Sequence, residues 1–354
     1  MLTRTSASSN QRLKLIYPPA LAAQARICML VLFLLQTLGA CSDHEAPVSQ
    51  YEHASQGVYA AALTNGGEKL VIGSINHGGS LWSTRDSERL YNWNHRQGEF
   101  SQITQIGFSE DQGFVVTAGP QDLVLWNAET GEGDALWSTY SEILDIAVLR
   151  DAEFVLMGLS DHSAKLFDLK NGGTRRIYHH QDQVNTVDVF KPGNIAVTGS
   201  NDRLVKIWAL NPGKLSGEAQ QPLHTLEHNE AVQIARLSPD GSLLFTMAQY
   251  DGARIWDPIT GQLKLELGLG DFAKKRGTLI RSAQFSNDGK LLLTGTSDRI
   301  IRLWDVESGD VMRTWQTPKR NGMDPQGLSV LALAFNAEGG YSAVTSDGVH
   351  HRLR

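Results

Sequence analysis

Cysteine is scarce in this chain of 354 residues, which contains only Cys28 and Cys41. Both lie in the first 41 residues, so the remainder of the chain cannot form a disulfide bond even in an oxidising compartment. The stability of that larger part must therefore come from a packed apolar core.

Acidic residues are missing from the first 40 residues, which contain four basic residues. An apolar run from Ile27 to Leu38 follows the basic region, and Gly39 and Ala40 follow the run. A basic region, a short apolar run and small residues are typical of a secretory signal peptide. The run is too short to cross a bilayer, which takes about 20 apolar residues. We therefore predict a signal peptide over residues 1–40 and a polar tether over residues 41–50.

Basic charge is in deficit after residue 40, where 28 basic residues face 38 acidic ones and the net charge is −10. Nucleic-acid binding needs a basic surface that neutralises phosphates. The charge balance thus argues against a general nucleic-acid partner.

The common catalytic motifs are absent: the sequence has no GxSxG, no HExxH and no GxxxxGK[ST]. The histidine pairs 179–180 and 350–351 are adjacent in sequence. Neighbours on a strand point to opposite faces, so we do not expect one metal site to use both members of a pair. These observations predict a protein that is not an enzyme and that has no metal, no cofactor and no small-molecule substrate.

A repeated unit is the main positive feature of the sequence. Residues 194–208, NIAVTGSNDRLVKIW, contain two short alternating apolar runs around a polar break, a pattern that predicts two β-strands. A similar unit recurs at 291–304 and, more weakly, at 154–167. The position of the closing aromatic residue recurs every 41 to 49 residues along the chain, at Trp82, Trp126, Phe167, Trp208, Trp256, Trp304 and, as a leucine, Leu353.

This period and these units resemble the WD40-repeat family, whose blades take about 40–45 residues in four strands. The resemblance covers almost all of the chain after residue 47. It implies an all-β, seven-bladed WD40-type propeller over residues 51–354, in which neighbouring sheets bury each other's apolar faces. The last repeat lacks an outer strand, and we predict that residues about 48–54 supply it and close the ring.

The resemblance also implies a structural tetrad in each blade: a histidine, a serine or threonine, an aspartate and a tryptophan. His180, Thr198, Asp202 and Trp208 match all four positions. We expect the other blades to be incomplete. The fifth has Tyr250 rather than aspartate six residues before its tryptophan, the second has Asp122 out of register, and the sixth has Arg276 at the histidine position.

The sequence LGAC at residues 38–41 resembles a bacterial lipobox, in which the cysteine is lipidated and becomes the first residue of the mature protein. This resemblance implies a lipid anchor at Cys41. Ser42 in the following position implies sorting to the outer membrane, with the protein facing the periplasm. The alternative is an ordinary signal peptide followed by an incidental cysteine.

Two longer links, residues 268–279 and 316–329, flank the sixth repeat. Together they contain a local basic patch with one aromatic residue, comprising Phe272, Lys274, Lys275, Arg276, Lys319 and Arg320. One interpretation is a docking site for an acidic partner or an anionic polymer of the cell envelope. The other is a pair of solvated surface loops without a specific role.

The sequence favours a non-catalytic scaffold for protein–protein interaction, held at the bacterial cell envelope by its N-terminal lipid. Two alternatives stay open. One is a propeller enzyme of the lactonase or hydrolase type, which would require converging carboxylates or histidines at the central channel. The other is an accessory factor in outer-membrane protein assembly, which rests on architecture alone.

Overall fold

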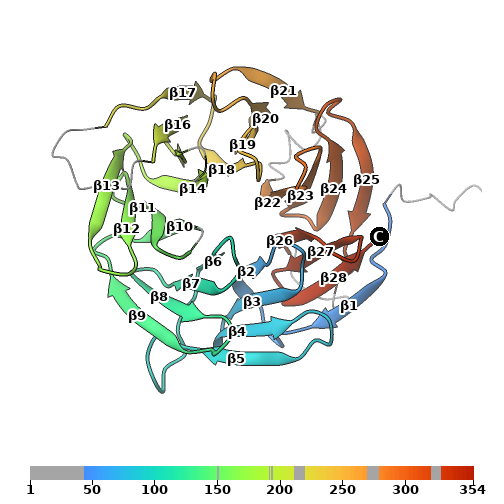
Figure 1. Cartoon of the computed structure of the whole chain (residues 1–354). Coiled ribbons are helices and arrows are strands. Elements are labelled where there is room, and N and C mark those ends of the chain that lie inside the picture. The colour runs from blue at the N-terminus through green and yellow to red at the C-terminus, as the bar shows by residue number, and fades with distance from the viewer. Residues whose placement is uncertain are drawn as a thin grey trace, which may run out of the picture. The chain divides into compact units, whose positions relative to one another are not determined.

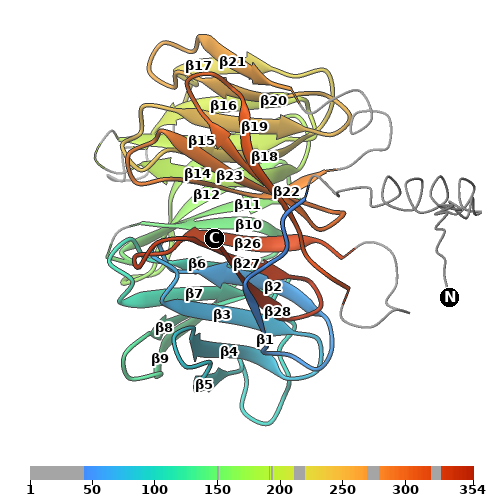
Figure 2. The same ribbon diagram turned by 90° about the vertical axis from the view of Figure 1, so that its right-hand side faces the viewer.

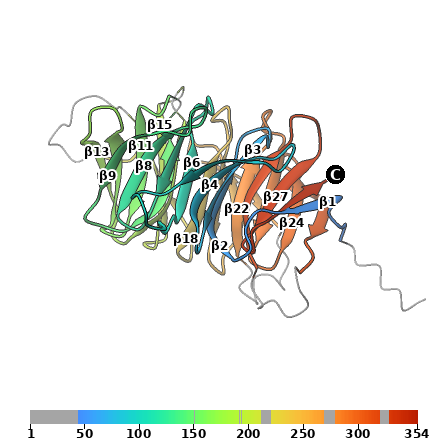
Figure 3. The same cartoon turned by 90° about the horizontal axis from the view of Figure 1, so that it is seen from below.

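The computed structural model describes residues 44–149, 151–190, 192, 194–210, 220–268, 279–319 and 328–354. Residues His44–Arg354 form one compact unit. Within it, 28 strands assemble into seven four-stranded antiparallel sheets around a common centre (Figure 1). Figure 3 shows the ring from its edge, with the sheets side by side. The predicted seven-bladed, all-β propeller is confirmed.

Each blade is numbered by its place along the chain, and its strands run from the inside of the ring to the outside. Blade one contains β2 (Val58–Leu63), β3 (Lys69–Ser74), β4 (Gly78–Ser83) and β5 (Arg89–Trp93). Blade two contains β6 (Gln105–Phe108), β7 (Phe114–Ala118), β8 (Asp122–Asn127) and β9 (Gly133–Ser138). Blade three contains β10 (Ile143–Val148), β11 (Phe154–Leu159), β12 (Ser163–Asp168) and β13 (Thr174–His179). Blade four contains β14 (Val184–Phe190), β15 (Ile195–Ser200), β16 (Leu204–Ala209) and β17 (His224–Glu227).

The remaining blades follow the same order. Blade five contains β18 (Val232–Leu237), β19 (Leu244–Ala248), β20 (Ala253–Trp256) and β21 (Leu263–Leu267). Blade six contains β22 (Ile280–Phe285), β23 (Leu291–Thr296), β24 (Ile300–Asp305) and β25 (Val311–Gln316). Blade seven contains β26 (Val330–Phe335), β27 (Tyr341–Thr345), β28 (Val349–Leu353) and the N-terminal strand β1 (Ser49–Glu52).

Strand β1 closes the ring, as the sequence predicted. It pairs antiparallel with β28 from Ser49 opposite Arg352 to Glu52 opposite Val349, and Figure 2 shows the two strands together. This pairing gives blade seven its fourth strand from the other end of the unit. Ring closure by a shared sheet covers the edge of β28, which would otherwise be open to pairing with another chain.

The core is divided among the seven seams between blades. Each of the seven buried apolar clusters in the described part of the chain draws residues from two neighbouring blades. At the seam of blades three and four, for example, Leu156 and Leu166 pack with Val187 and Trp208. A single sheet has two apolar faces that it cannot bury alone, so each blade depends on both neighbours.

Glycine sets the closest approach between several blades. A Cβ added at Gly199 of β15 would lie 2.6 Å from Cγ1 of Val232 in the next blade, and one at Gly295 of β23 would lie 2.4 Å from Cγ1 of Val330. These glycines belong to the repeated TGS and TGT sequences. Because these positions have no side chain, the next blade can approach closely. This explains why the unit places a glycine, which weakens a strand, among β-branched residues.

The segment before β1 is attached to blade six. Glu45 accepts a hydrogen bond from the backbone N–H of Gln316 (3.1 Å) and donates its own N–H to the carbonyl of Thr314 (2.8 Å). Its carboxylate binds both Nε (2.9 Å) and Nη2 (2.7 Å) of Arg313. The polar tether expected over residues 41–50 therefore lies against the propeller from Glu45 onward, because this chain segment finds backbone partners on β25.

Candidate functional site

The four predicted tetrad residues of blade four lie together. Nε1 of Trp208 donates to Oγ1 of Thr198 (2.8 Å), and Nε2 of His180 lies 2.7 Å from the same oxygen. Nδ1 of His180 lies 2.8 Å from Oδ2 of Asp202. The tetrad links the residue that follows β13, the outer strand of blade three, to the second strand, the following turn and the third strand of blade four.

One arrangement of protons satisfies the whole chain of bonds. The tryptophan N–H can donate only to Thr198, so the threonine O–H donates to Nε2 of a neutral His180, whose Nδ1–H then donates to Asp202. Burial lowers the pKa of His180, and the bond to Asp202 only partly opposes that shift. Burial works against the charge on Asp202, but hydrogen bonds from His180 and the Gln181 N–H outweigh it and lower the aspartate pKa to about 2.

Blade five has a complete tetrad, so the expectation that it is incomplete is wrong. His228 lies 3.1 Å from Asp251 and 2.9 Å from Thr246, which accepts a bond from Trp256 (2.8 Å). The aspartate stands one residue later than in blade four because Tyr250 adopts a left-handed conformation (φ 57°) in the turn. The turn thus accommodates the changed spacing and places the Asp251 carboxylate within reach of His228.

Blade two also has a complete tetrad, which the sequence reasoning missed. Nδ1 of His95 lies 2.9 Å from Asp122, and its Nε2 lies 2.9 Å from Thr117, which accepts a bond from Trp126 (2.8 Å). Asp122 is thus in place, although it is only four residues before the tryptophan. His95 stands 22 residues before its threonine, whereas the histidines of blades four and five stand 18 before theirs. The sequence signal for this tetrad was His95 itself, which a longer link places outside the spacing found in blades four and five.

The other blades keep only parts of this network in the described residues. In blade six Trp304 donates to Thr294 (2.8 Å), while Asp298 accepts from Thr296 instead. In blade three Asp161 accepts from Ser141, Ser163 and Lys165, and Phe167 has no side-chain N–H to donate. The expectation of incomplete tetrads therefore holds for these two blades as far as the structure describes them.

Blade seven replaces the tetrad with a group of buried histidines. His350 and His351 on β28 contact Ser342 (2.9 Å) and Thr345 (3.0 Å) on the neighbouring strand. His53, just after β1, is 4% exposed, and neither of its ring nitrogens has a hydrogen-bond partner among the described residues. Its ring meets Trp82 of blade one edge-on at 4.7 Å and lies 5.9 Å from the ring of His350.

These three histidines are held in their neutral form. Burial, aided by nearby Arg89, lowers the pKa of His53 to about 4. Burial, together with His53, Arg352 and His351, lowers the pKa of His350 to about 3. Burial lowers the pKa of His351 to about 4 despite the opposing charge of Asp347.

Two carboxylates converge on the innermost strands, the region where a propeller enzyme would place its site. Asp145 on β10 accepts from the Val187 N–H (2.9 Å) and pairs with Arg236 (3.1 Å) on β18. Asp188 on β14 accepts from the Leu237 N–H (2.7 Å). Burial raises the pKa of Asp188, and although burial opposes the charge on Arg236, the two carboxylates raise the pKa of its guanidinium.

Each of these carboxylates holds a backbone N–H of the next blade, and Arg236 also donates to Thr186 (2.9 Å). The network joins blades three, four and five across their inner strands. Buried polar groups that satisfy one another stiffen a structure. Both carboxylates are thus committed to bonds that connect blades, which suits a structural function better than proton transfer.

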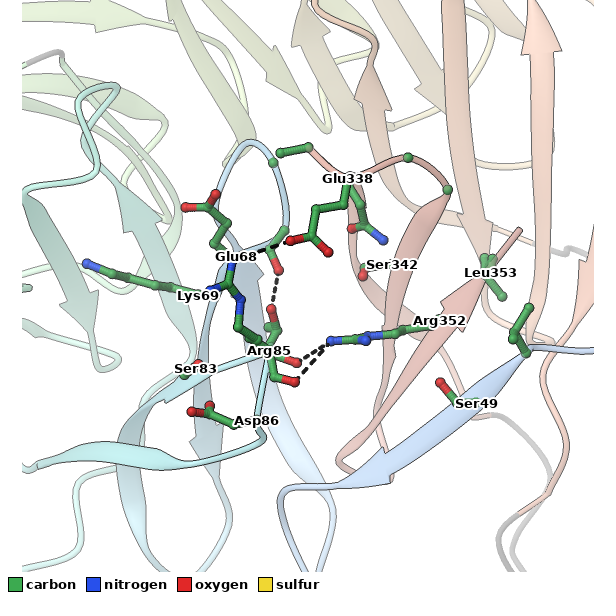
Figure 4. Close-up of a pocket in the computed structure, with 18 of the residues that line it drawn as sticks. Ser49, Glu68, Lys69, Ser83, Arg85, Asp86, Glu338, Ser342, Arg352 and Leu353 are labelled. Atoms are coloured by element: carbon green, nitrogen blue, oxygen red, sulfur yellow. Dashed lines mark hydrogen bonds and ion pairs between the residues drawn. The ribbon is translucent and has the colours of Figure 1, made fainter.

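A cavity of about 1030 Å³ lies at the seam of blades one and seven (Figure 4). Arg352 reaches across it and donates to the carbonyl of Thr84 (2.6 Å), and Arg85 pairs with Glu338 (3.3 Å). Both signs of charge line the cavity, with Glu68, Lys69, Asp86 and Arg354 among the further residues. Because groups of both charges lie beside apolar surface, the lining gives no preference for ligands of one charge.

Most of the other residues singled out in the sequence lie outside the described residues. Cys41 does, as do five members of the basic patch, Phe272, Lys274, Lys275, Arg276 and Arg320. Lys319 is described and is exposed, three residues after the end of β25. In the described ranges, no set of three or more metal-ligating side chains gathers. The same ranges contain no helix long and apolar enough to cross a membrane.

Two stretches of the chain match known repeat families. Residues 173–209 match the family described as WD domain, G-beta repeat, and residues 234–338 match the Anaphase-promoting complex subunit 4 WD40 domain. The first stretch contains most of blade four with its tetrad. The second covers blades five and six and the start of blade seven.

Several curated proteins are similar over part of the chain. The guanine nucleotide-binding protein subunit beta of Arabidopsis thaliana is 27% identical over 171 residues, 46% of this chain and 45% of that protein. Human transducin beta-like protein 3 is 27% identical over 217 residues, 60% of this chain and 25% of that protein. Human F-box/WD repeat-containing protein 4 is 33% identical over 134 residues, 37% of this chain and 31% of that protein. The chain spans less than half the length of each of these relatives. The chain therefore forms a seven-bladed propeller, and parts of it are similar to the repeats of WD-repeat proteins.

Proposed function

We propose that this protein is a non-catalytic scaffold that binds other proteins and is anchored by lipid at Cys41 to the bacterial cell envelope. The observation that carries the scaffold function is the ring itself. Three blades have complete hydrogen-bonded tetrads, and the inner strands of blades three to five are joined by Asp145, Asp188 and Arg236. Such a frame holds its exposed loops in fixed positions, as a multivalent binding surface requires.

The relatives support this function in general terms. Proteins named as a guanine nucleotide-binding protein subunit beta and as an F-box/WD repeat-containing protein carry similar repeats. The word subunit in the first name describes a component of a larger assembly, and we infer a comparable role for this chain.

The anchor is inferred from the sequence LGAC and the basic, apolar leader before it. We place the protein at the outer membrane, facing the periplasm, because Ser42 follows the cysteine. A Cys41→Ser variant expressed in a Gram-negative host with labelled fatty acid should lose acyl labelling and appear in the soluble periplasmic fraction. Retained label on the variant would exclude the anchor.

The scaffold function is tested by crosslinking the intact protein in its own envelope and identifying the captured proteins. A variant with Lys274, Lys275 and Arg276 changed to alanine tests the basic patch as the docking site. The matched control changes three exposed basic residues outside the two links, Arg96, Lys170 and Lys290, to alanine. We expect the first variant to lose partners that the control keeps. Equal capture by both variants would leave the patch as solvated loops, and capture of no protein at all would contradict the scaffold.

A further inference from the structure

The contact between Glu45 and blade six has a consequence for how an anchored propeller is oriented. We propose that the rim formed by the outer strands of blades six and seven, β25 and β1, is the surface that faces the lipid bilayer. This inference rests on the proposed lipid anchor at Cys41. It adds to that proposal the side of the ring that faces the membrane.

Chain length sets the first constraint. Glu45 is four residues after Cys41, and four extended residues span at most ~14 Å. Glu45 itself is bonded to Thr314 and Gln316 of β25. A lipid on Cys41 therefore brings the bilayer surface within about one short segment of the outer edge of blade six.

The attachment of Glu45 sets the second constraint, because it prevents the propeller from turning freely on its leader. Two backbone hydrogen bonds join Glu45 to β25 in parallel register, and the Arg313 guanidinium binds both carboxylate oxygens. That guanidinium also lies 5.4 Å from the centre of the Trp315 ring. A few residues later the N–H of Val48 donates to the carbonyl of Arg352, so the segment is held on both blades.

The exposed side chains of this rim suit the boundary between lipid headgroups and acyl chains. Val48 is 65% exposed, Met312 is 56% exposed and Val311 is 42% exposed, and Arg313 lies beside them in sequence. Exposed apolar side chains of this kind can enter the interface between headgroups and acyl chains. Leu136 on β9 of blade two is 46% exposed, so apolar exposure alone does not choose a rim. The Glu45 attachment makes the choice.

Single-cysteine probes can test the orientation, because the chain has no cysteine beyond Cys41. Met312→Cys places a probe on blade six, and Leu136→Cys places a matched probe on blade two, which lies across the ring (Figure 1). Each acylated protein is labelled with a fluorophore and reconstituted in phosphatidylethanolamine–phosphatidylglycerol vesicles that contain headgroup nitroxide lipid. We expect quenching of the Met312 probe to be at least twofold stronger than quenching of the Leu136 probe.

A second pair of variants tests the cause of the orientation. Glu45→Gln and Arg313→Gln remove the ion pair without touching Cys41, and each should reduce the difference between the two probes. Mass spectrometry of every sample separates the two hypotheses. Absence of the acyl chain would overturn the anchor and the orientation together. Equal quenching of both probes on protein that carries the acyl chain would overturn the orientation alone. Val311→Cys provides a replacement probe if Met312→Cys does not fold.

Discussion

Blades four and seven both bury histidine, but they use it in opposite ways. In blade four both ring nitrogens of His180 have partners, and the bonds continue to Asp202 and Trp208. In blade seven, within the part of the chain that the structure describes, His53 has no hydrogen-bond partner on either nitrogen, and His350 and His351 each have one unpartnered nitrogen. Blade four thus gains stability from a saturated polar network. Blade seven depends on strand pairing and apolar contact, and it buries groups that acid can charge.

The comparison predicts that the shared threonine of a complete tetrad is the most sensitive position. Thr198→Val keeps the shape of the side chain but leaves Nε2 of His180 and Nε1 of Trp208 without their hydrogen-bond partner in the core. Each buried unsatisfied group costs about 1–3 kcal/mol, so we expect a loss of about 3 kcal/mol in the free energy of unfolding. Thr294→Val in blade six is the matched control, because only Trp304 is seen to depend on it. It should cost about 1–2 kcal/mol in urea unfolding. Equal losses would show that the histidine bond adds nothing.

Acid should weaken blade seven through His53. Above pH 6.5 the residue is neutral in both the folded and the unfolded chain. As the pH falls, the unfolded chain takes up the proton first, because the folded pKa is about 4. Stability therefore declines between about pH 6.5 and pH 4, by about 1.4 kcal/mol per pH unit for one proton, or roughly 3 kcal/mol in all. His350 and His351 act in the same direction.

Substituting the histidine tests this prediction. His53→Phe keeps an aromatic ring against Trp82 and should reduce the slope of stability against pH by about one proton. Val344→Ala is the control, since it lowers stability without removing a titrating group. Its unfolding free energy should run parallel to that of the parent between pH 7 and pH 4. An unchanged slope in His53→Phe would contradict the role of this residue.

The two blades also differ in how they meet the next blade. Gly199 of blade four leaves no room for a Cβ against Val232, whereas Val344 at the corresponding position of blade seven is buried in the cluster with Val58. We expect Gly199→Ala to lower the free energy of unfolding by about 1–3 kcal/mol through overpacking. Val344→Ala should cost about 2 kcal/mol because it leaves a cavity. Thermal unfolding of both variants checks these losses. It tests whether the seam at Gly199 is destabilised by an added atom and the seam at Val344 by removed atoms.

The sequence predicts the fold more reliably than it predicts the polar contacts. The recurrence of Trp82, Trp126, Trp208 and the later markers reflects a packing position that every blade needs, so the blade count and the closing strand could be predicted from it. The tetrads depend on atoms meeting in space, and turns can absorb an inserted residue. The tetrads of His95 and His228 were therefore hidden from a rule of fixed spacing.

The histidine group of blade seven could not be predicted for a related reason. His53, Trp82 and His350 come from the start, an early part and the end of the unit, and only ring closure brings them together. Nothing in the local sequence around His53 distinguishes a buried histidine from an exposed one. Contacts that depend on closure become visible only once the whole ring is known.

The smallest effect is expected at the junction between the two regions, where Glu45 joins blade six to the segment that enters blade seven. The Glu45–Arg313 pair has side chains 44% and 40% exposed, and pairs of this kind contribute about 1 kcal/mol or less. Glu45→Gln should therefore shift the urea midpoint only slightly, while Glu338→Gln, whose pair with Arg85 is over 80% exposed, should not shift it measurably. A loss of several kcal/mol in Glu45→Gln would mean that the ion pair itself holds the ring closed. A small loss would mean that β1 and the apolar seam close the ring by themselves.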